Sequence, residues 1–110
     1  MYVIRGTYLP REGTYFDREY YAANHLRLAR ELLRDRVSYS RMHAEFDTRV
    51  LMDGRERRSP CVFVLRVESE ADVEAFRNFR AGPHVFPLRE DARKYTNCDL
   101  EWTVAEVVEG

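Results

Sequence analysis

The sequence has little of what marks several large classes of protein. It holds only 2 cysteines, Cys61 and Cys98, with neither the density of a disulfide scaffold nor the spacing of a metal site. No apolar run approaches the ~20 residues that cross a bilayer, and the N-terminus lacks the pattern of a signal peptide. We therefore expect free thiols, no membrane partner and a cytoplasmic location.

An excess of charge of either sign is also missing. With 18 basic and 19 acidic residues, the net charge is −1, so the chain lacks the basic surplus that binds phosphate backbones. There is no GxGxxG or phosphate loop, and the three histidines lack the spacing of metal ligands. We expect no nucleic-acid partner, no metal and no cofactor. Haem held through a single histidine, His25 or His84, is the alternative left open.

What the chain does have is the size and balance of one globular domain, residues 1–110, at 45 % hydrophobic and 34 % charged. No repeat or linker divides it. β-Formers predict strands at residues 2–8, 37–46, 61–67 and 102–108. Helix caps at Asp17 and Ser69 predict that a helix begins at each of these residues. Pro87 suits the first position of a short third helix over residues 87–94. Residues 53–58 are predicted to form a polar loop.

The resulting order, β-α-β-β-α-β, is typical of a ferredoxin-like α+β fold. In this fold a four-stranded antiparallel sheet carries its helices on one face. The opposite face of the sheet would then be apolar and open to solvent, and packing against a second copy is the simplest way to cover it. We expect a homodimer that pairs through the sheet.

His25 stands where an aliphatic residue would be expected in the first helix. At 100° per residue, Tyr21, His25, Leu28 and Leu32 form one stripe that faces the sheet. Burial favours the neutral imidazole, which suits proton transfer near neutral pH. The same position also suits a core histidine that bonds a sheet carbonyl or a tyrosine hydroxyl. Helix spacing leaves both roles open.

Two separated segments resemble one known family. FDREYYAANH, residues 16–25, resembles the F-D-x-x-Y-Y-x-x-x-H signature of the EthD-like family of dimeric α/β-barrel proteins. The C-terminal EDARKYTNCDLEWTVAEVV resembles the closing segment of that family, with an aromatic-Thr pair at Tyr95-Thr96 and a last strand ending in Glu106-Val107. A Met-Pro-Leu-like run usually follows the histidine in the family, and LRL replaces it here.

The resemblance implies a ferredoxin-like subunit, paired into a dimeric barrel, with a pocket between helices and sheet into which His25 points. Members and close relatives include cofactor-free anthrone oxygenases, polyketide cyclases, a lactone isomerase and dehydratase-like proteins. Two functions follow. One is a small cofactor-free enzyme that uses acid–base chemistry on a hydrophobic aromatic, phenolic or lactone molecule, with His25 as catalytic residue. The other is a non-catalytic binding or accessory protein with the same pocket.

Further catalytic candidates lie on the second predicted strand. Tyr39, Arg41 and His43 share one face by the period-2 rule. If this face looks toward the first helix, Tyr39 and Arg41 would stabilise an oxyanion beside His25 and His43 would contact the substrate. If it looks the other way, all three lie at the dimer interface, where Tyr and Arg are common. The sequence leaves both orientations open.

Other candidate substrate contacts come from the helix stripe and the C-terminal segment. Tyr21 lies one turn before His25, and Leu28 follows it in the stripe. Tyr95 and His84 belong to irregular chain that could close the pocket. Two of these residues have a structural alternative: Tyr21 suits core packing, and His84 suits an exposed loop position.

Overall fold

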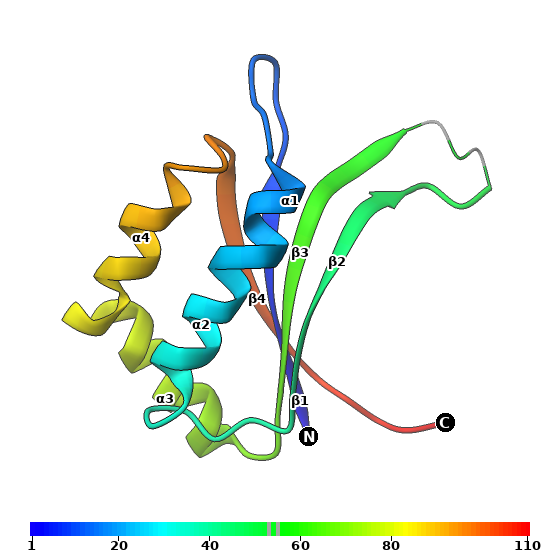
Figure 1. The fold of residues 1–110 in the computed structure, drawn as a ribbon. Coiled ribbons are helices and arrows are strands. Elements are labelled where there is room, and N and C mark those ends of the chain that lie inside the picture. Colours follow the sequence, from blue (N-terminus) through cyan, green and yellow to red (C-terminus); the bar gives the residue numbers. More distant parts are fainter. Residues whose placement is uncertain (53, 55) are drawn as a thin grey trace.

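The structure is a computed structural model that describes residues 1–52, 54 and 56–110. Its strands are β1 (Tyr2–Leu9), β2 (Arg41–Arg49), β3 (Arg57–Val67) and β4 (Asp99–Glu106). Its helical segments are α1 (Arg18–Tyr20), a π-helical turn (Tyr21–His25), α2 (Leu26–Leu33), α3 (Glu70–Ala81), a 3-10 turn (Pro83–Val85) and α4 (Phe86–Ala92). The predicted order of strands and helices is therefore confirmed (Figure 1).

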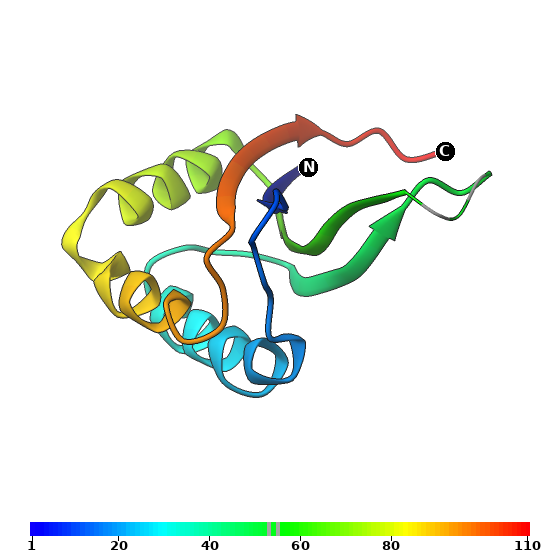
Figure 2. The same ribbon diagram turned by 90° about the horizontal axis from the view of Figure 1, so that it is seen from above.

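The four strands form one antiparallel sheet in the order β2-β3-β1-β4. The helices all lie on one side of this sheet (Figure 2). The arrangement is the predicted ferredoxin-like α+β fold. Its main core lies between the helices and β1 and β3, with Ile4, Phe63 and Leu65 from the sheet facing Phe76 and Phe79 from α3.

Ser69 begins α3 as predicted. Its hydroxyl accepts a hydrogen bond from the Asp72 backbone N–H, and the Asp72 carboxylate accepts one from the Ser69 backbone N–H. Val73, Phe76 and Phe79 are buried on the inner face of the helix. The local cap and the apolar spacing together place this helix correctly.

Several strand boundaries differ from the prediction. β2 begins at Arg41 because Val37 still closes the preceding helix, where its N–H donates to the Leu33 carbonyl at 3.0 Å. β4 begins at Asp99, which pairs with Leu9, and ends at Glu106. β3 begins at Arg57, so the polar loop is shorter than predicted. Asp53 and Arg55 of that loop lie outside the described residues.

The face of the sheet that carries no helix is more polar than predicted. Val62 and Val64 at its centre are already buried within the subunit. Charged residues of the neighbouring strands flank them. Arg5 lies 4.0 Å from Glu45, which also contacts His43 at 3.2 Å. Strand alternation therefore sets an apolar centre within a charged rim on this face.

Gly6 of β1 allows Trp102 of β4 to lie flat across the inner face of the sheet. The two residues are paired in the register, and a Cβ atom at Gly6 would lie 2.8 Å from the indole ring. The indole also contacts Phe63 and Phe76, with ring centroids 5.9 and 5.1 Å away. A larger residue at Gly6 must displace this ring.

We expect Gly6→Val to lower the free energy of unfolding by about 1–3 kcal/mol, the range for overpacking a core. Trp102 is the only tryptophan, so its fluorescence emission should shift in the folded variant. Thr7→Val, one residue along on the opposite face, is the control and should change stability by less than about 0.5 kcal/mol. Equal stability and emission for Gly6→Val and the parent would contradict the close contact.

Within the described part of the chain, no helix combines the length and the apolar character needed to cross a membrane.

Candidate active site

The first helical run contains a π turn at the residues that carry the family-like motif. Asp17 caps the run by accepting a hydrogen bond from the Tyr20 N–H at 3.1 Å. The Leu26 N–H then bonds the Tyr21 carbonyl, five residues back, so one extra residue is fitted into this turn. The turn aligns the rings of Tyr21 and His25, whose centroids lie 5.4 Å apart at an interplanar angle of 26°.

The π turn changes which residues face the sheet. The buried positions are Tyr21, His25, Ala29 and Leu33, spaced four residues apart. A regular 3.6-residue helix had predicted Leu28 in this stripe. The extra residue in the turn rotates the following helix, so Leu28 is only partly buried and does not line the pocket.

The two motif segments meet in space. The Asp17 N–H donates to the Tyr95 carbonyl at 2.7 Å, and the Thr96 hydroxyl donates to the Tyr15 carbonyl at 2.7 Å. The Tyr95 ring consequently lies against His25, with ring centroids 4.7 Å apart. The start of the first helix and the segment before β4 thus build one wall together.

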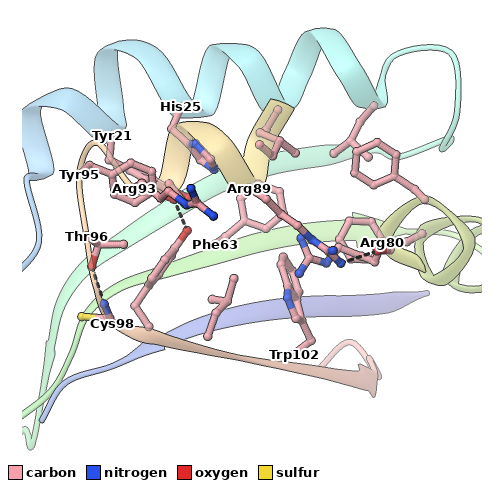
Figure 3. A pocket seen from close by; sticks show the side chains of 18 residues that line it. Tyr21, His25, Phe63, Arg80, Arg89, Arg93, Tyr95, Thr96, Cys98 and Trp102 are labelled. Carbon is pink, nitrogen blue, oxygen red and sulfur yellow. Dashed lines mark hydrogen bonds between the residues drawn. The ribbon is translucent and has the colours of Figure 1, made fainter. Parts of the chain in front are cut away.

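A pocket of about 180 Å³ opens between the helices and the inner face of the sheet (Figure 3). Aromatic and aliphatic side chains form most of its wall. Polar groups and Arg93 lie at the His25 end, and Arg80 and Arg89 line the opposite end. The lining includes Tyr8, His25, Arg80, Arg89, Tyr95 and Trp102. The pocket has the mostly apolar wall with few polar groups that small-molecule sites share.

His25 is held by a carboxylate that no sequence motif indicated. Asp91, in α4, is buried and its Oδ2 lies 3.0 Å from His25 Nδ1. The other oxygen of Asp91 accepts a hydrogen bond from the Tyr20 hydroxyl at 2.7 Å. Because an ionised carboxylate can only accept, the hydrogen between the two groups is on Nδ1. The other ring nitrogen, Nε2, is then a free acceptor.

The protonation states fit this arrangement. Burial lowers the pKa of His25 below its usual 6.5, outweighing the opposite effect of Asp91. Burial alone would raise the pKa of Asp91, but hydrogen bonds from Tyr20 and His25 outweigh it and lower this pKa. Near neutral pH the pair is therefore a neutral imidazole oriented by an ionised carboxylate.

Two tyrosine hydroxyls form a second polar group of the pocket. The hydroxyls of Tyr8 and Tyr95 are 2.6 Å apart. Burial raises the pKa of both phenols, so both stay protonated. Only one of their two hydrogens lies between the oxygens, so the other is available to a ligand. The pair can therefore donate one hydrogen bond to a bound oxygen atom.

The structure settles which face of β2 looks inward. Met42, Ala44 and Phe46 pack against the core below the helices. By strand alternation, Arg41 and His43 lie on the opposite face, the second of the two orientations that the sequence left open. His43 bonds Glu45 there and is not in the pocket wall.

Two other candidates also lie away from the pocket. Tyr39 precedes β2, is partly buried against the main core and does not line the cavity. His84 is exposed in the 3-10 turn, where its Nδ1 lies 3.2 Å from an Arg36 nitrogen. Of the predicted site residues, the structure brings together three: Tyr21, His25 and Tyr95.

Several residues of the site were not predicted from the sequence. Asp91 stands four residues before Tyr95, which was predicted, and this spacing could have suggested that the two residues lie on one side of the chain. Tyr8 and Trp102 point inward from their strands, but aromatic residues in such positions usually indicate core packing. Nothing local marks Arg80 among the other arginines, since its position depends on how α3 meets α4.

The described residues contain no cluster of three or more His, Cys, Asp or Glu side chains that could hold a metal ion. Burial raises the pKa of the Cys61 thiol to about 12, and both cysteines are free.

No protein-family model and no curated protein matches the chain. Solved structures do match. An EthD-like protein of Ralstonia eutropha JMP134 has a TM-score of 0.74 at 18 % identity, over 98 % of this chain and 92 % of that one. An EthD-family protein of Bacillus halodurans C-125 has a TM-score of 0.58 at 18 % identity, over 98 % and 99 %. A proposed antibiotic biosynthesis monooxygenase of Deinococcus radiodurans has a TM-score of 0.57 at 16 % identity, over 100 % and 95 %.

These comparisons concern the fold, because all three identities are low. The chain has the ferredoxin-like fold of EthD-like proteins, as its two motif segments predicted. The same fold serves many chemistries, so the activity depends on the side chains of the pocket and not on the fold.

Proposed function

We propose that this protein is a cofactor-independent enzyme that moves a proton on a hydrophobic ring molecule bound in the pocket. The observation that carries the proposal is the hydrogen bond from His25 Nδ1 to the Asp91 carboxylate. It leaves Nε2 as an acceptor on an imidazole that lines the cavity. A neutral histidine oriented by a buried carboxylate is the arrangement expected of a general base.

The pocket also contains the partner that such a base needs. When Nε2 takes a proton from carbon or oxygen of the ligand, negative charge develops on a ligand oxygen. The Tyr8–Tyr95 hydroxyl pair can donate a hydrogen bond to that oxygen. Protonated His25 then returns the proton to another atom of the ligand. The net change is an isomerisation, cyclisation or elimination that needs no electron acceptor.

Hydrogen–deuterium exchange tests this function even when the product of the reaction is unidentified. Purified protein in D2O is screened by NMR against phenolic, quinone and lactone compounds. The proposal expects deuterium to enter an enolisable or phenol-activated carbon of at least one bound compound. Binding without exchange across every compound that binds would favour the non-catalytic binding role in its place.

The exchange rate should depend on pH through His25. Only the neutral imidazole can accept a proton, so kcat/KM should fall on acidification as His25 becomes protonated. Because burial lowers the pKa of His25 below 6.5, the decline should begin below pH 6.5, and the rate should be constant around neutrality. A rate that stays constant on acidification for as long as the protein remains folded would contradict a histidine base.

We also propose that the subunit pairs through the helix-free face of its sheet. This face carries both signs of charge, with Arg5 and His43 beside Glu45, so two copies can pair their charges in an isologous interface, in which the same patch meets itself. Light scattering at micromolar concentration should give about twice the subunit mass of 13.1 kDa. His43→Glu, which places a second acid beside Glu45 on this face, should shift the population toward monomer. A parent protein of 13.1 kDa would contradict the pairing.

A further inference from the structure

The end of the pocket opposite His25 is cationic, whereas the wall between the two ends is apolar. Arg80, at the inner side of α3, places its guanidinium 4.7 Å from the centre of the Trp102 ring. Arg89 of α4 reaches back and donates to the Arg80 carbonyl at 3.0 Å. Figure 3 shows both side chains over the indole, at the end opposite Thr96. Two like charges thus share a partly enclosed space.

No carboxylate of the described residues pairs with either guanidinium. The acids nearest in sequence are engaged elsewhere: Glu74 bonds Arg77, Glu90 lies 3.8 Å from Arg93, and Asp91 holds His25. Burial and the charge of Arg89 both lower the pKa of Arg80, so the surroundings disfavour its charge. Arg80 is half-buried, and its charge, which lacks a carboxylate partner among the described residues, loses part of its hydration, a cost that a bound anion would offset.

Trp102 adds an unused donor to the same end. Its indole N–H is buried and finds no hydrogen-bond acceptor among the described residues. A guanidinium fork pairs with the two oxygens of a carboxylate, and an indole N–H is a further donor that such an oxygen can accept from. The remaining wall at this end, with Phe63 and Phe76, offers only apolar contact.

The volume of the pocket suits a small ring. An apolar cavity of ~150 Å³ accommodates benzene. The pocket here measures about 180 Å³, which adds space for one substituent. A ring that contacts the aromatic wall would present one end to the arginines and another atom to His25.

We propose that the pocket selects ring molecules that carry a carboxylate, held by Arg80 with support from Arg89 and the Trp102 N–H. The anionic group fixes the orientation of the ring, and His25 then faces a defined atom of it. This inference rests on the proposed function only because both concern the same pocket. Its prediction concerns ligand binding and not turnover.

The test compares acids with their neutral amides. Benzoate, salicylate and 2-furoate are each titrated beside the corresponding primary amide, following the single indole N–H signal of Trp102 by NMR. We expect each carboxylate to bind more tightly than its amide in the parent protein. Arg80→Met, which keeps the aliphatic contact with Trp102, should weaken carboxylate binding by about 10- to 100-fold. It should change amide binding by about twofold or less.

Arg77→Met is the matched control, since Arg77 is an exposed arginine of the same helix that pairs with Glu74. It should leave both classes of ligand unchanged. Absence of a carboxylate preference in the parent, or an equal loss for acids and amides in Arg80→Met, would overturn the inference. His25→Gln should keep the carboxylate preference, so failure of the arginine site and failure of the histidine base are measured separately.

Discussion

His25→Gln should lower kcat for the exchange reaction by ~10²–10⁴-fold, the range for loss of a general acid–base group. The amide is still polar and can bond a ligand or Asp91, but it cannot accept a proton at neutral pH. Ligand affinity should therefore be retained in part. The change in affinity is measured as Kd by titration, and the change in turnover is measured as kcat in the NMR exchange assay, both on one protein preparation.

Thermal melting distinguishes a catalytic role of His25 from a role in packing. His25→Leu removes the hydrogen bond to Asp91 but fills the buried position, and its Tm should stay near that of the parent or rise, because functional groups often lower stability. A structural histidine behaves differently. Its replacement would cost ~1–3 kcal/mol and leave turnover unchanged, and that combination would contradict the catalytic role.

Asp91→Asn should reduce kcat by about 10²-fold while leaving the fold intact. The carboxylate accepts hydrogen bonds on both oxygens, from His25 and from the Tyr20 hydroxyl. An amide has one acceptor and one donor end, so His25 is no longer held in a single tautomer. When the amide donates to Nδ1, the hydrogen moves to Nε2 and the base is lost. The exchange assay and circular dichroism together measure the effect.

Two control variants isolate the orienting effect of Asp91. Glu90→Gln changes the adjacent acid, which is exposed and paired with Arg93, and should leave kcat unchanged. Tyr20→Phe removes one hydrogen bond from Asp91 but keeps the one to His25, so kcat should fall by less than in Asp91→Asn. Equal kcat for Asp91→Asn and the parent would show that His25 does not need this partner.

Features of the fold that depend on residues close together in the sequence were predictable. The cap at Ser69 and the apolar spacing of Val73, Phe76 and Phe79 place α3, because a helix start and its buried face depend on residues within a few turns. Strand centres followed from runs of β-formers, while strand ends were wrong by a few residues. Asp99 joins β4 because Leu9 is its partner across the sheet, which a local pattern does not contain.

The site was predictable only where a motif repeats a known arrangement. Tyr21, His25 and Tyr95 came from the family-like segments, and the structure brings all three to the pocket. The two orientations of Arg41 and His43 could not be separated, because a shift of one residue exchanges the two faces of a strand. Packing of Met42, Ala44 and Phe46 against the core decides between them.

Local sequence thus specified the order of the elements, the helix caps and a histidine on a buried helical face. Tertiary structure decided what that histidine meets. The π turn replaces Leu28 with Ala29 on the inner face, and α4 brings Asp91 to His25 across 66 positions of the chain. Arg80 and Arg89 likewise share one end of the pocket only because α3 and α4 meet there. Side-chain contacts between distant segments depend on how whole elements pack, and no local spacing encodes them.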